Sequence, residues 1–407
     1  MHFNTLSQWL DYIKSQHPTE MDLSLERVID IGHKLNILNP KCPVITVGGT
    51  NGKGSTVAGL ESIYLAQKYK VGAFTTPFIF KFNEQLRING KDISDDLLIS
   101  AFEKIEAARG ETTLTIFEFK TLAACLIFKE ENLDIWLLEV GLGGRFDAVN
   151  AIDADIAVIT SIGLDHTEWL GNTREDIALT KSGIFRPGKP AVCGDPNPPE
   201  TLFHTHFYCQ GKEFSFTEEE TTWSWTSKNK ELKNLPKTKL LLQNMSTVLM
   251  VIELMQYRLP VSQNNIIQGL SNASLPGRIQ VLPGDVTKIF DVSHNPDSAE
   301  LLATHLRKNT VTGKTHAVFS MLADKDIQKT LLAIKDCVSH WHIGPIKDAR
   351  AASLSVLDYC FRALNISNKQ AYESLNQAYQ SALNQAKPGD QIVIFGSFRT
   401  VSEATST

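Results

Sequence analysis

The chain has 407 residues and a formal net charge of -5 at pH 7, with 42% hydrophobic and 21% charged residues. This length exceeds the size at which one hydrophobic core usually stops growing, so two domains are expected. The acidic balance disfavours nucleic acid as a partner, because binding to a phosphate backbone relies on basic patches. No stretch approaches the roughly 20 apolar residues of a membrane span, so no membrane partner is expected.

The start of the chain predicts an amphipathic helix. Phe3, Leu6, Leu10 and Ile13 recur at helical spacing, whereas a signal peptide needs a basic start and an unbroken apolar run. The six cysteines form no CxxC pair, so neither a zinc site nor a disulfide framework is expected. Together these features predict a soluble cytoplasmic protein with reduced thiols.

Strands alternate with helices through the first part of the chain. In chain order, the pattern predicts a strand at 44–47, a helix to about 69, a strand at 71–74, helices at 95–109 and 119–129, and strands at 135–140 and 156–160. This alternation is typical of parallel βαβ units, in which helices cover both faces of a parallel sheet.

A second α/β pattern follows a less regular segment. Short runs at 214–216 and 223–225 predict an antiparallel patch, and helices are expected at 243–257 and 263–271. Beyond it we expect strands at 288–292, 317–320, near 341 and at 391–395, with helices from 297 and 326. Pro-Gly pairs at 276–277 and 283–284 indicate that the boundary between the two α/β domains lies in this segment. The predicted domains are residues 1–274 and 286–407, joined by a hinge at 275–285.

A glycine-rich loop is the clearest chemical signal. Residues Gly48 to Ser55 lie between a predicted strand and a predicted helix, where backbone N–H groups and the helix N-terminus bind polyphosphate. Lys53 would neutralise β/γ-phosphate charge, and the Ser55 hydroxyl would reach Mg²⁺. The loop departs from the strict P-loop pattern, because Gly54 separates Lys53 from Ser55.

Five further residues are candidates of unequal strength. Glu139 ends an apolar strand, where a carboxylate suits a hard cation, although a solvent-facing charge is an equal alternative. His166 follows another strand, but a single histidine is more often structural than a ligand. Lys181 on its own is typical of an ordinary solvated lysine. Asp291 at a strand end suits ribose hydroxyls, and Arg278 is either a phosphate clamp or a solvated charge.

Five motifs occur in one order: GTNGKGS at 49–55, LEVGLGGR at 138–145, LDHT at 164–167, LPGR at 275–278 and DVSHNP at 291–296. With them, the chain from Trp9 to Phe398 resembles the bacterial folylpolyglutamate synthase/dihydrofolate synthase family of the Mur ligase superfamily. The resemblance implies an α/β fold with an N-terminal P-loop-type ATPase domain carrying a pteroate site, and a smaller Rossmann-like C-terminal glutamate ligase domain. It also implies MgATP, L-glutamate and a pterin carboxylate as substrates, with an acyl-phosphate intermediate.

The resemblance also assigns roles to residues. ATP is implied to contact Thr50, Asn51, Gly52, Lys53, Gly54, Ser55, Asn244, Arg278 and Asp291. Two Mg²⁺ ions are implied at Ser55, Thr76, Glu139 and His166. Dihydropteroate is implied to bind Asp22, Leu23, Ser24, Leu25, Thr115, Ile116, Phe117, Glu118, Phe146, Asp147 and Ala148, with Phe117 stacked on the pterin ring. The implied catalytic residues are Lys53, Lys181, His166 and His294, and Lys181 is implied to be carbamylated, which reverses its interpretation as a solvated lysine. The chain departs from the family at three positions: it has Thr76 where a serine is usual, Phe78 where a histidine is usual and Thr180 where a glutamate is common.

The sequence therefore predicts an ATP-dependent ligase that adds L-glutamate to 7,8-dihydropteroate and to reduced folates. A monofunctional folylpolyglutamate synthase or another Mur-type amino-acid ligase is the alternative. A cell-wall ligase is disfavoured because the phosphate loop begins by residue 48, which leaves no room for a UDP-binding domain. A nucleotide-dependent switch is disfavoured because it would not need the second domain. A monomer is expected, and whether a monovalent cation is also needed stays open.

Overall fold

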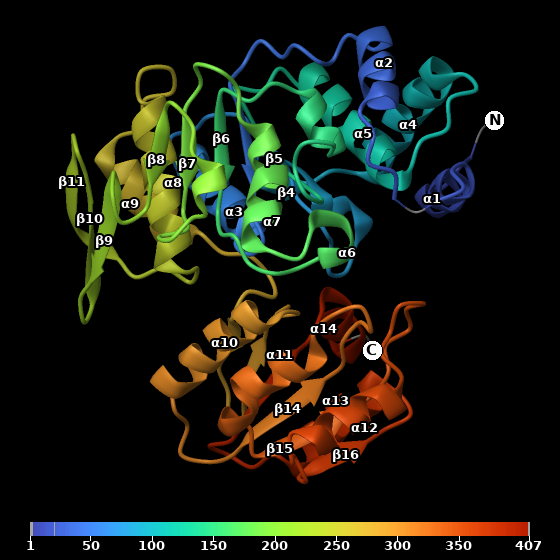
Figure 1. Cartoon of the computed structure of the whole chain (residues 1–407), viewed down its shortest axis with the longest axis vertical. Helices are drawn as coiled ribbons and strands as arrows, with labels where there is room; N and C mark the ends of the chain where they lie inside the picture. Colours follow the sequence, from blue (N-terminus) through green and yellow to red (C-terminus); the bar gives the residue numbers. More distant parts are fainter. Residues whose placement is uncertain (1–2, 20, 406–407) are drawn as a thin grey trace. The chain divides into compact units, whose positions relative to one another are not determined.

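The computed structural model describes residues 3–19 and 21–405. The chain folds into two compact α/β units, the first ending at Ser274 and the second beginning at Leu275 (Figure 1). Each unit is built on its own sheet, as the alternation of predicted strands and helices indicates. The α/β fold class with a larger N-terminal unit and a smaller Rossmann-like C-terminal unit is confirmed.

The first unit contains an eight-stranded sheet in the order β4-β3-β2-β5-β1-β6-β7-β8. Its strands are β1 (Val44–Gly48), β2 (Val71–Phe74), β3 (Leu86–Ile88), β4 (Lys91–Asp92), β5 (Ile135–Glu139), β6 (Ile156–Ile159), β7 (Ala191–Cys193) and β8 (Phe207–Cys209). All pairings are parallel except those of β3 and β4. Six carboxyl strand ends therefore meet at one edge of the sheet, which is where α/β sheets bind ligands.

Helices bury both faces of this sheet. They are α1 (Leu6–Ser15), α2 (Glu26–Lys34), α3 (Lys53–Ala66), α4 (Asp95–Arg109), α5 (Ile116–Glu130), α6 (Thr167–Leu170), α7 (Arg174–Lys181), α8 (Leu242–Met255) and α9 (Gln263–Asn272), with short 3-10 turns η1 (Phe82–Gln85), η2 (Ala148–Ala151), η3 (Ser182–Ile184) and η4 (Glu200–Leu202). Trp136 and Leu138 of β5 belong to one core with α1, α4 and α5. Helix α3 packs with α8 and α9 and also contacts β1, β2 and β5.

A separate three-stranded sheet confirms the predicted antiparallel patch. It consists of β9 (Phe214–Glu218), β10 (Thr222–Ser227) and β11 (Glu231–Pro236), with β10 in the middle. Trp223 and Trp225 of β10 are completely buried, and Trp225 Nε1 donates to the carbonyl oxygen of Ser246 in α8 at 3.1 Å. Burial of two indole rings thus attaches this small sheet to the helices of the first unit.

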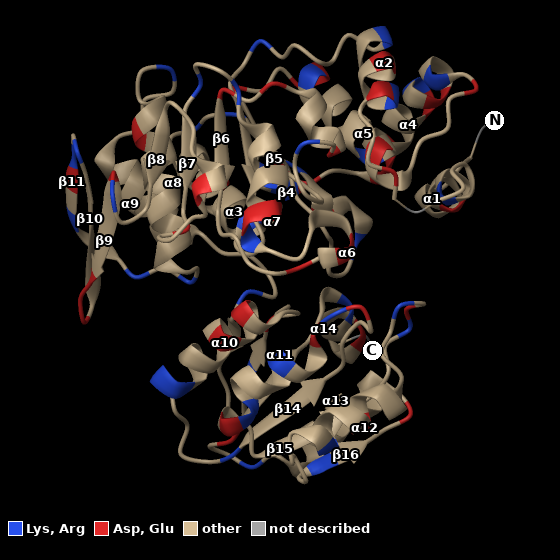
Figure 2. Cartoon of the chain, in the orientation of Figure 1, with Lys and Arg blue, Asp and Glu red and all other residues tan. Residues whose placement is uncertain are grey.

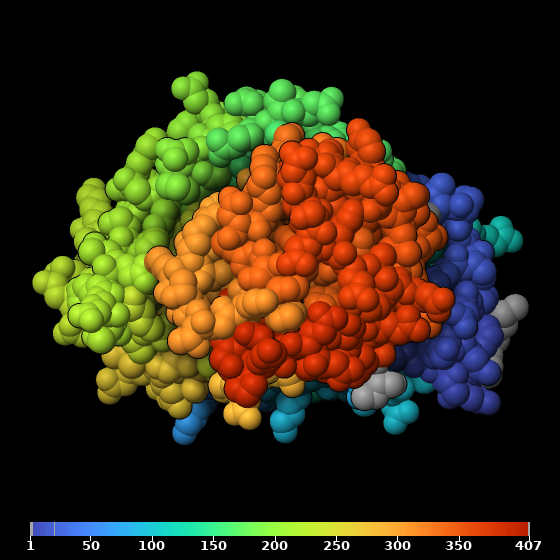
Figure 3. Space-filling view, turned by 90° about the horizontal axis from the view of Figure 1, so that it is seen from below, coloured from blue at the N-terminus to red at the C-terminus, as the bar shows by residue number. Residues whose placement is uncertain are grey.

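The second unit has a six-stranded sheet in the order β12-β13-β17-β14-β15-β16. The strands are β12 (Gln280–Leu282), β13 (Thr287–Phe290), β14 (Thr315–Phe319), β15 (His340–Ile343), β16 (Lys369–Ala371) and β17 (Gln391–Phe395), and the helices are α10 (Pro296–Lys308), α11 (Ile327–Ile334), α12 (Leu354–Ala363), α13 (Leu375–Gln385) and α14 (Phe398–Thr405), with the 3-10 turn η5 (Lys335–Cys337). Only β12 is antiparallel. Residues 280–282, within the predicted hinge, therefore form an edge strand of this unit. Figure 3 shows the surface of the second unit in orange and red.

Most long elements lie where the sequence predicts them, whereas several short strands have no recognisable sequence pattern. Strands β3, β4, β7 and β8 have only two or three residues, too few to display a period.

All six cysteines are free thiols, as expected. Within the described residues, no helix is long and apolar enough to cross a membrane. Both basic and acidic residues are seen on each of the two units in Figure 2.

Candidate active site

The glycine-rich loop leaves β1 and enters α3, which begins at Lys53. Residues from the end of β6 fix its shape: the hydroxyls of Thr160 and Ser161 donate to the carbonyl oxygen of Asn51 at 2.6 and 3.1 Å. Gly52 has φ +91°, and a Cβ there would lie 2.6 Å from Asn244 Oδ1. The loop is therefore preorganised before any ligand arrives, with its backbone N–H groups at the start of a helix.

Two lysines from different elements meet at this loop. Lys53 Nζ donates to the carbonyl oxygens of Gly49 and Thr50 at 3.1 and 3.2 Å, and Lys181 Nζ donates to Gly49 at 3.0 Å. Lys181 is only 5% exposed, so the interpretation of this residue as a solvated lysine is wrong. Burial, reinforced by the positive charge of Lys53, lowers the pKa of Lys181 to about 7, against the opposing pull of Asp165. Much of the Lys181 amine is therefore neutral at physiological pH.

Glu139 and Thr76 lie at the ends of the neighbouring strands β5 and β2. Glu139 is buried, and its Oε2 accepts a hydrogen bond from the Thr76 backbone N–H at 3.1 Å. The Thr76–Pro77 peptide bond is cis. Ser55 is buried in the first turn of α3. Glu139 is therefore not the solvent-facing charge that the sequence left as an alternative.

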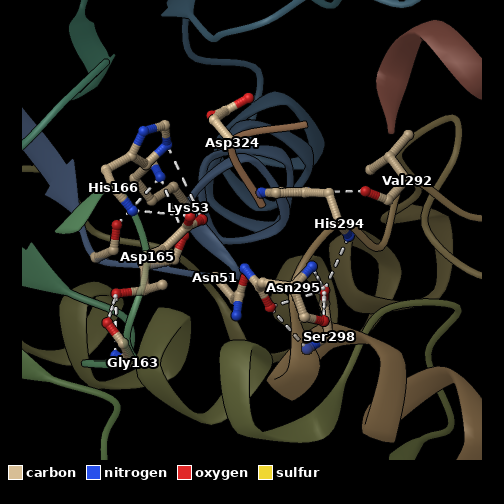
Figure 4. A network of polar contacts seen from close by, with 12 residues as sticks. Asn51, Lys53, Gly163, Asp165, His166, Val292, His294, Asn295, Ser298 and Asp324 are labelled. Carbon is tan, nitrogen blue, oxygen red and sulfur yellow. Dashed lines mark hydrogen bonds and ion pairs between the residues drawn. The ribbon is translucent and has the colours of Figure 1, made fainter. Parts of the chain in front are cut away.

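His166 has an unusual backbone conformation. Its φ of +52° lies in the left-handed region, which is uncommon for a residue other than glycine and clusters at functional sites. Its backbone N–H donates to Asp165 Oδ1 at 2.9 Å, and its Nε2 lies 3.9 Å from Asp165 Oδ2. Figure 4 shows the His166 ring and the Asp165 carboxylate close to Lys53.

The residues at this edge fit a hard divalent cation. Ser55, Thr76 and Glu139 offer oxygen atoms, which Mg²⁺ prefers, and His166 offers an imidazole nitrogen. In the described part of the chain, no cluster of three His, Cys, Asp or Glu side chains is arranged to hold a metal by itself. Such a set suits Mg²⁺ held by one or two carboxylates together with substrate phosphates, rather than an all-protein cage.

Two predicted substrate segments are joined by a residue that sequence reasoning missed. Arg27 donates to Asp22 Oδ2 at 2.8 Å and to Glu118 Oε1 at 2.9 Å. Glu118 is buried, and its other oxygen accepts from the backbone N–H of Thr115 at 2.7 Å, forming a capping box with the Thr115 side chain at the start of α5. The arginine holds the pKa of the Asp22 carboxyl below its usual value, and Ser24 also contributes a hydrogen bond.

The aromatic candidate Phe117 faces the loop after β5. A Cβ at Gly141 would lie 2.5 Å from the Phe117 ring and 3.2 Å from Asp147 Oδ2, so these three residues are in close contact. Asp147 accepts hydrogen bonds from the backbone N–H groups of Leu142 and Val149 at 2.8 and 3.0 Å. Burial nevertheless raises the pKa of Asp147 to about 6.

The remaining substrate candidates differ in exposure. Ala148 is buried at the start of η2, whereas Phe146 is half exposed. Ile116 opens α5, and Leu23 and Leu25 are partly buried before α2. Among the predicted residues of the first unit, the structure therefore brings together the loop, Glu139, Thr76, Phe117 and Asp147 at one sheet edge.

The second unit groups its own candidates at the end of β13. The Arg278 guanidinium lies 4.8 Å from the centroid of the Phe398 ring, and the His294 ring lies 6.2 Å from it. His294 Nδ1 donates to the carbonyl oxygen of Val292 at 2.9 Å, as Figure 4 also shows. Arg278 is therefore held by an aromatic face and is not simply a solvated charge. No sequence pattern predicts this contact of Phe398.

Asp291 is buried and has a structural role within the second unit. Its two carboxylate oxygens accept hydrogen bonds from the backbone N–H groups of Ile279 and Ser293, each at 2.8 Å. These bonds hold the segments on both sides of β13. A carboxylate oxygen has two lone pairs, so the predicted contact with ribose hydroxyls is compatible with this structural role.

The Mur ligase middle domain matches residues 47–228, and the Mur ligase glutamate ligase domain matches residues 277–398. The fold and the site thus define a ligase of the Mur type. The chain is 39% identical to the dihydrofolate synthase/folylpolyglutamate synthase of Escherichia coli K12, over 98% of this chain and 94% of that protein. It belongs to the dihydrofolate synthase/folylpolyglutamate synthase family, whose members are ATP-dependent ligases.

Two solved structures are similar throughout. E. coli FolC in complex with DHPP and ADP has a TM-score of 0.94, with 39% identity over 98% of this chain and 96% of that chain. A bifunctional folylpolyglutamate synthase/dihydrofolate synthase with Mn, AMPPNP and L-glutamate bound has a TM-score of 0.91, with 39% identity over 98% of this chain and 97% of that chain.

Proposed function

We propose that this protein is an ATP-dependent ligase that adds L-glutamate to 7,8-dihydropteroate and to reduced folates. One structural observation carries the proposal. The carboxyl ends of β1, β2, β5 and β6 deliver a phosphate-type loop, a threonine, a buried carboxylate and a histidine to one sheet edge, where Phe117 packs on Gly141. The similar proteins with DHPP, ADP, AMPPNP and L-glutamate bound support the same assignment.

ATP is proposed to bind along residues 50–55. The N–H groups of the loop and of the first turn of α3 would hold its phosphates, because a helix N-terminus carries partial positive charge. Lys53 would neutralise charge on the β- and γ-phosphates. Asn244, which touches Gly52, would contact the nucleotide, and Arg278 and Asp291 are proposed as further ATP contacts.

Two Mg²⁺ ions are proposed at Ser55, Thr76, Glu139 and His166, and the need for a monovalent cation is open. When bound, Mg²⁺ neutralises developing charge on phosphoryl and acyl oxygens. The chain's own contribution is to hold Glu139 buried at a strand end, where the Thr76 N–H fixes the orientation of the carboxylate. His166, whose backbone is left-handed, would aim its imidazole at the same edge.

Lys181 is proposed to be carbamylated. A neutral amine attacks CO₂, forms an N–C bond and releases a proton, so the product is a carbamate with one negative charge. The lowered pKa supplies the neutral amine, and the product would place an anion beside the Lys53 cation. A carboxylate at this position would add an oxygen donor for the second metal.

The proposed reaction has two steps. A carboxylate oxygen of the pterin substrate attacks the γ-phosphorus of ATP, which breaks the bond to the β-phosphate oxygen and gives an acyl phosphate and ADP. The glutamate amine then attacks the acyl carbon, loses a proton and expels phosphate. Phe117 would hold the pterin ring by stacking, while the segments at 22–25 and 115–118, which Arg27 joins, would line the site. His294 is proposed to act near the glutamate and the phosphate.

We further propose that the protein works as a monomer in the cytoplasm, without nucleic acid or membrane partners. The formal net charge of -5 supports this proposal, because binding to a phosphate backbone relies on basic patches.

Phosphate release tests the function directly. Purified protein with ATP, Mg²⁺ and L-glutamate is compared with 7,8-dihydropteroate, with tetrahydrofolate and without a pterin. Release with both pterins is expected. Release with tetrahydrofolate alone would favour a monofunctional folylpolyglutamate synthase, and release with neither would contradict the proposal and favour another amino-acid ligase.

A further inference from the structure

A buried lysine in the first unit has no role in the function proposed above. Lys120 lies one helical turn after Phe117 on α5, and its Nζ lies 4.9 Å from the centroid of the Phe117 ring and 5.9 Å from that of Phe74. The residue lies deep in the unit, yet part of its side chain remains accessible. Lys120 therefore lies beside the Phe117 ring rather than on the outer surface.

Its ammonium is held in one place by a neutral partner. Lys120 Nζ donates to Gln85 Oε1 at 2.6 Å, and Gln85 is 1% exposed. The Gln85 amide nitrogen donates in turn to the carbonyl oxygen of Phe82 at 3.1 Å, which fixes which end of the amide faces the lysine. The position of the cation is thus set by a buried side chain with a defined orientation.

This arrangement leaves hydrogen-bonding capacity unused. An ammonium has three N–H donors, and within residues 3–19 and 21–405 no acceptor other than Gln85 reaches Lys120 Nζ. The negative charges of Asp147 and Glu139 favour the charged form, although burial lowers the pKa to about 8. The two remaining donors are therefore open to an acceptor that a bound ligand supplies.

The neighbouring groups indicate what that acceptor belongs to. Phe117 presents an aromatic face, the edge of its ring packs on Gly141, and the Asp147 carboxylate lies in the same contact group. A flat ring stacked on Phe117 would place its edge near a donor on Lys120. The strongest acceptor on the ring of a pterin is its oxo oxygen.

We propose that Lys120 is a specificity-determining residue that donates a hydrogen bond to the oxo group of a pterin ring stacked on Phe117. The inference rests on the proposed function, since it assumes a pterin substrate. Lys120 thereby selects a ring with an acceptor at this position and disfavours one that carries an amino group there, because two donors would face each other.

The test compares Lys120→Met, which keeps the length of the side chain but removes its donors, with wild type. KM is measured separately for dihydropteroate, ATP and glutamate. We expect the pterin KM to rise by about 10- to 100-fold, the range for losing a hydrogen bond to a charged group, while the other two KM values change less than about twofold. Lys120→Arg should recover part of the loss. Lys129→Met, an exposed lysine on the same helix, is the matched control.

A second measurement does not depend on the folding of a variant. Fluorescence quenching gives the Kd of wild type for pteroate and for its 4-amino analogue, in which a donor replaces the oxo acceptor. We expect the oxo compound to bind at least about tenfold more tightly, and Lys120→Met to lose most of that preference. Equal binding of the two compounds by wild type, or an unchanged pterin KM in a folded Lys120→Met, would overturn the inference. Failure of wild type to release phosphate with any pterin would instead overturn the proposed function, and the inference with it.

Discussion

The side-chain nitrogens of Lys53 and Lys181 both lie on the carbonyl oxygen of Gly49, at 3.1 and 3.0 Å. Two cations on one neutral acceptor repel each other, and this repulsion adds to burial in lowering the pKa of Lys181. Anions would reduce this repulsion: polyphosphate would do so at Lys53, and a carbamate would do so at Lys181. The unliganded protein thus disfavours a second cation at the place where the proposed reaction brings negative groups.

The first prediction concerns the pH dependence of stability. The pKa of Lys181 is about 7 in the folded protein and 10.5 ordinarily, so between these values the unfolded chain binds more protons. Stability due to this residue therefore rises with pH across that window, with a slope of at most about 1.4 kcal/mol per pH unit. Urea unfolding in CO₂-free buffer should show that the free energy of unfolding of wild type rises relative to that of Lys181→Met from pH 7 to 10. The exposed Lys228→Met should show no such trend, and parallel curves for wild type and Lys181→Met would refute the assignment.

The second prediction concerns the modification itself. Lys181→Ala should lower turnover by about 100-fold or more, since a preorganised charged group at a phosphoryl site is worth that much. A short carboxylic acid such as acetate should restore part of the activity, because it can occupy the place of the carbamate. Steady-state phosphate release with and without acetate measures both effects. Unchanged turnover in Lys181→Ala would exclude the carbamate role.

The case of Lys181 also shows the limit of sequence reasoning. Strands such as β1 and β5 consist of five consecutive buried residues, so their apolar runs are visible in the sequence. Lys181 ends a short polar helix, and the polar sequence around it predicts a side chain exposed to solvent. Its side chain is buried against the phosphate loop, where Nζ donates to the carbonyl oxygen of Gly49, 132 positions away in the sequence. That contact is tertiary and leaves no periodic signal.

Arg27 illustrates the same limit for the site. Its partner Glu118 is 91 positions away, and neither residue stands in a motif that links them. The positions of the loop and of Glu139 could be predicted because strand ends share one sheet edge. Side chains such as Arg27, Lys120 and Phe398 become visible only when the chain is folded.

The third prediction tests the proposed metal site. Glu139→Gln keeps an oxygen that can accept from the Thr76 N–H but removes the negative charge. The Mg²⁺ concentration for half-maximal phosphate release should rise by about tenfold or more, as metal affinity falls when a charged ligand is lost. The exposed Glu130→Gln on α5 should leave the Mg²⁺ titration unchanged. An identical titration for Glu139→Gln and wild type would show that Glu139 faces no metal.

The fourth prediction tests the link between the two substrate segments. Arg27→Met leaves the buried Glu118 carboxylate without its cation, which should destabilise the protein by on the order of 3 kcal/mol. Adding Glu118→Gln removes the unpaired charge and should restore part of that loss. Urea unfolding of the two single variants and the double variant gives the coupling energy. Additive effects would mean that the pair contributes nothing specific.

The fifth prediction uses the contact between Gly141 and Phe117. A methyl group at Gly141 would lie 2.5 Å from the Phe117 ring, so Gly141→Ala must displace that ring. If Phe117 stacks on the pterin, the pterin KM should rise by about tenfold, the effect of about 1.4 kcal/mol, while the ATP KM stays unchanged because the phosphate loop is untouched. The control is Gly284→Ala, where an added Cβ meets no atom closer than 3.5 Å. Equal increases in both KM values would indicate a general disturbance of the sheet edge, and no change in either would place the pterin away from Phe117.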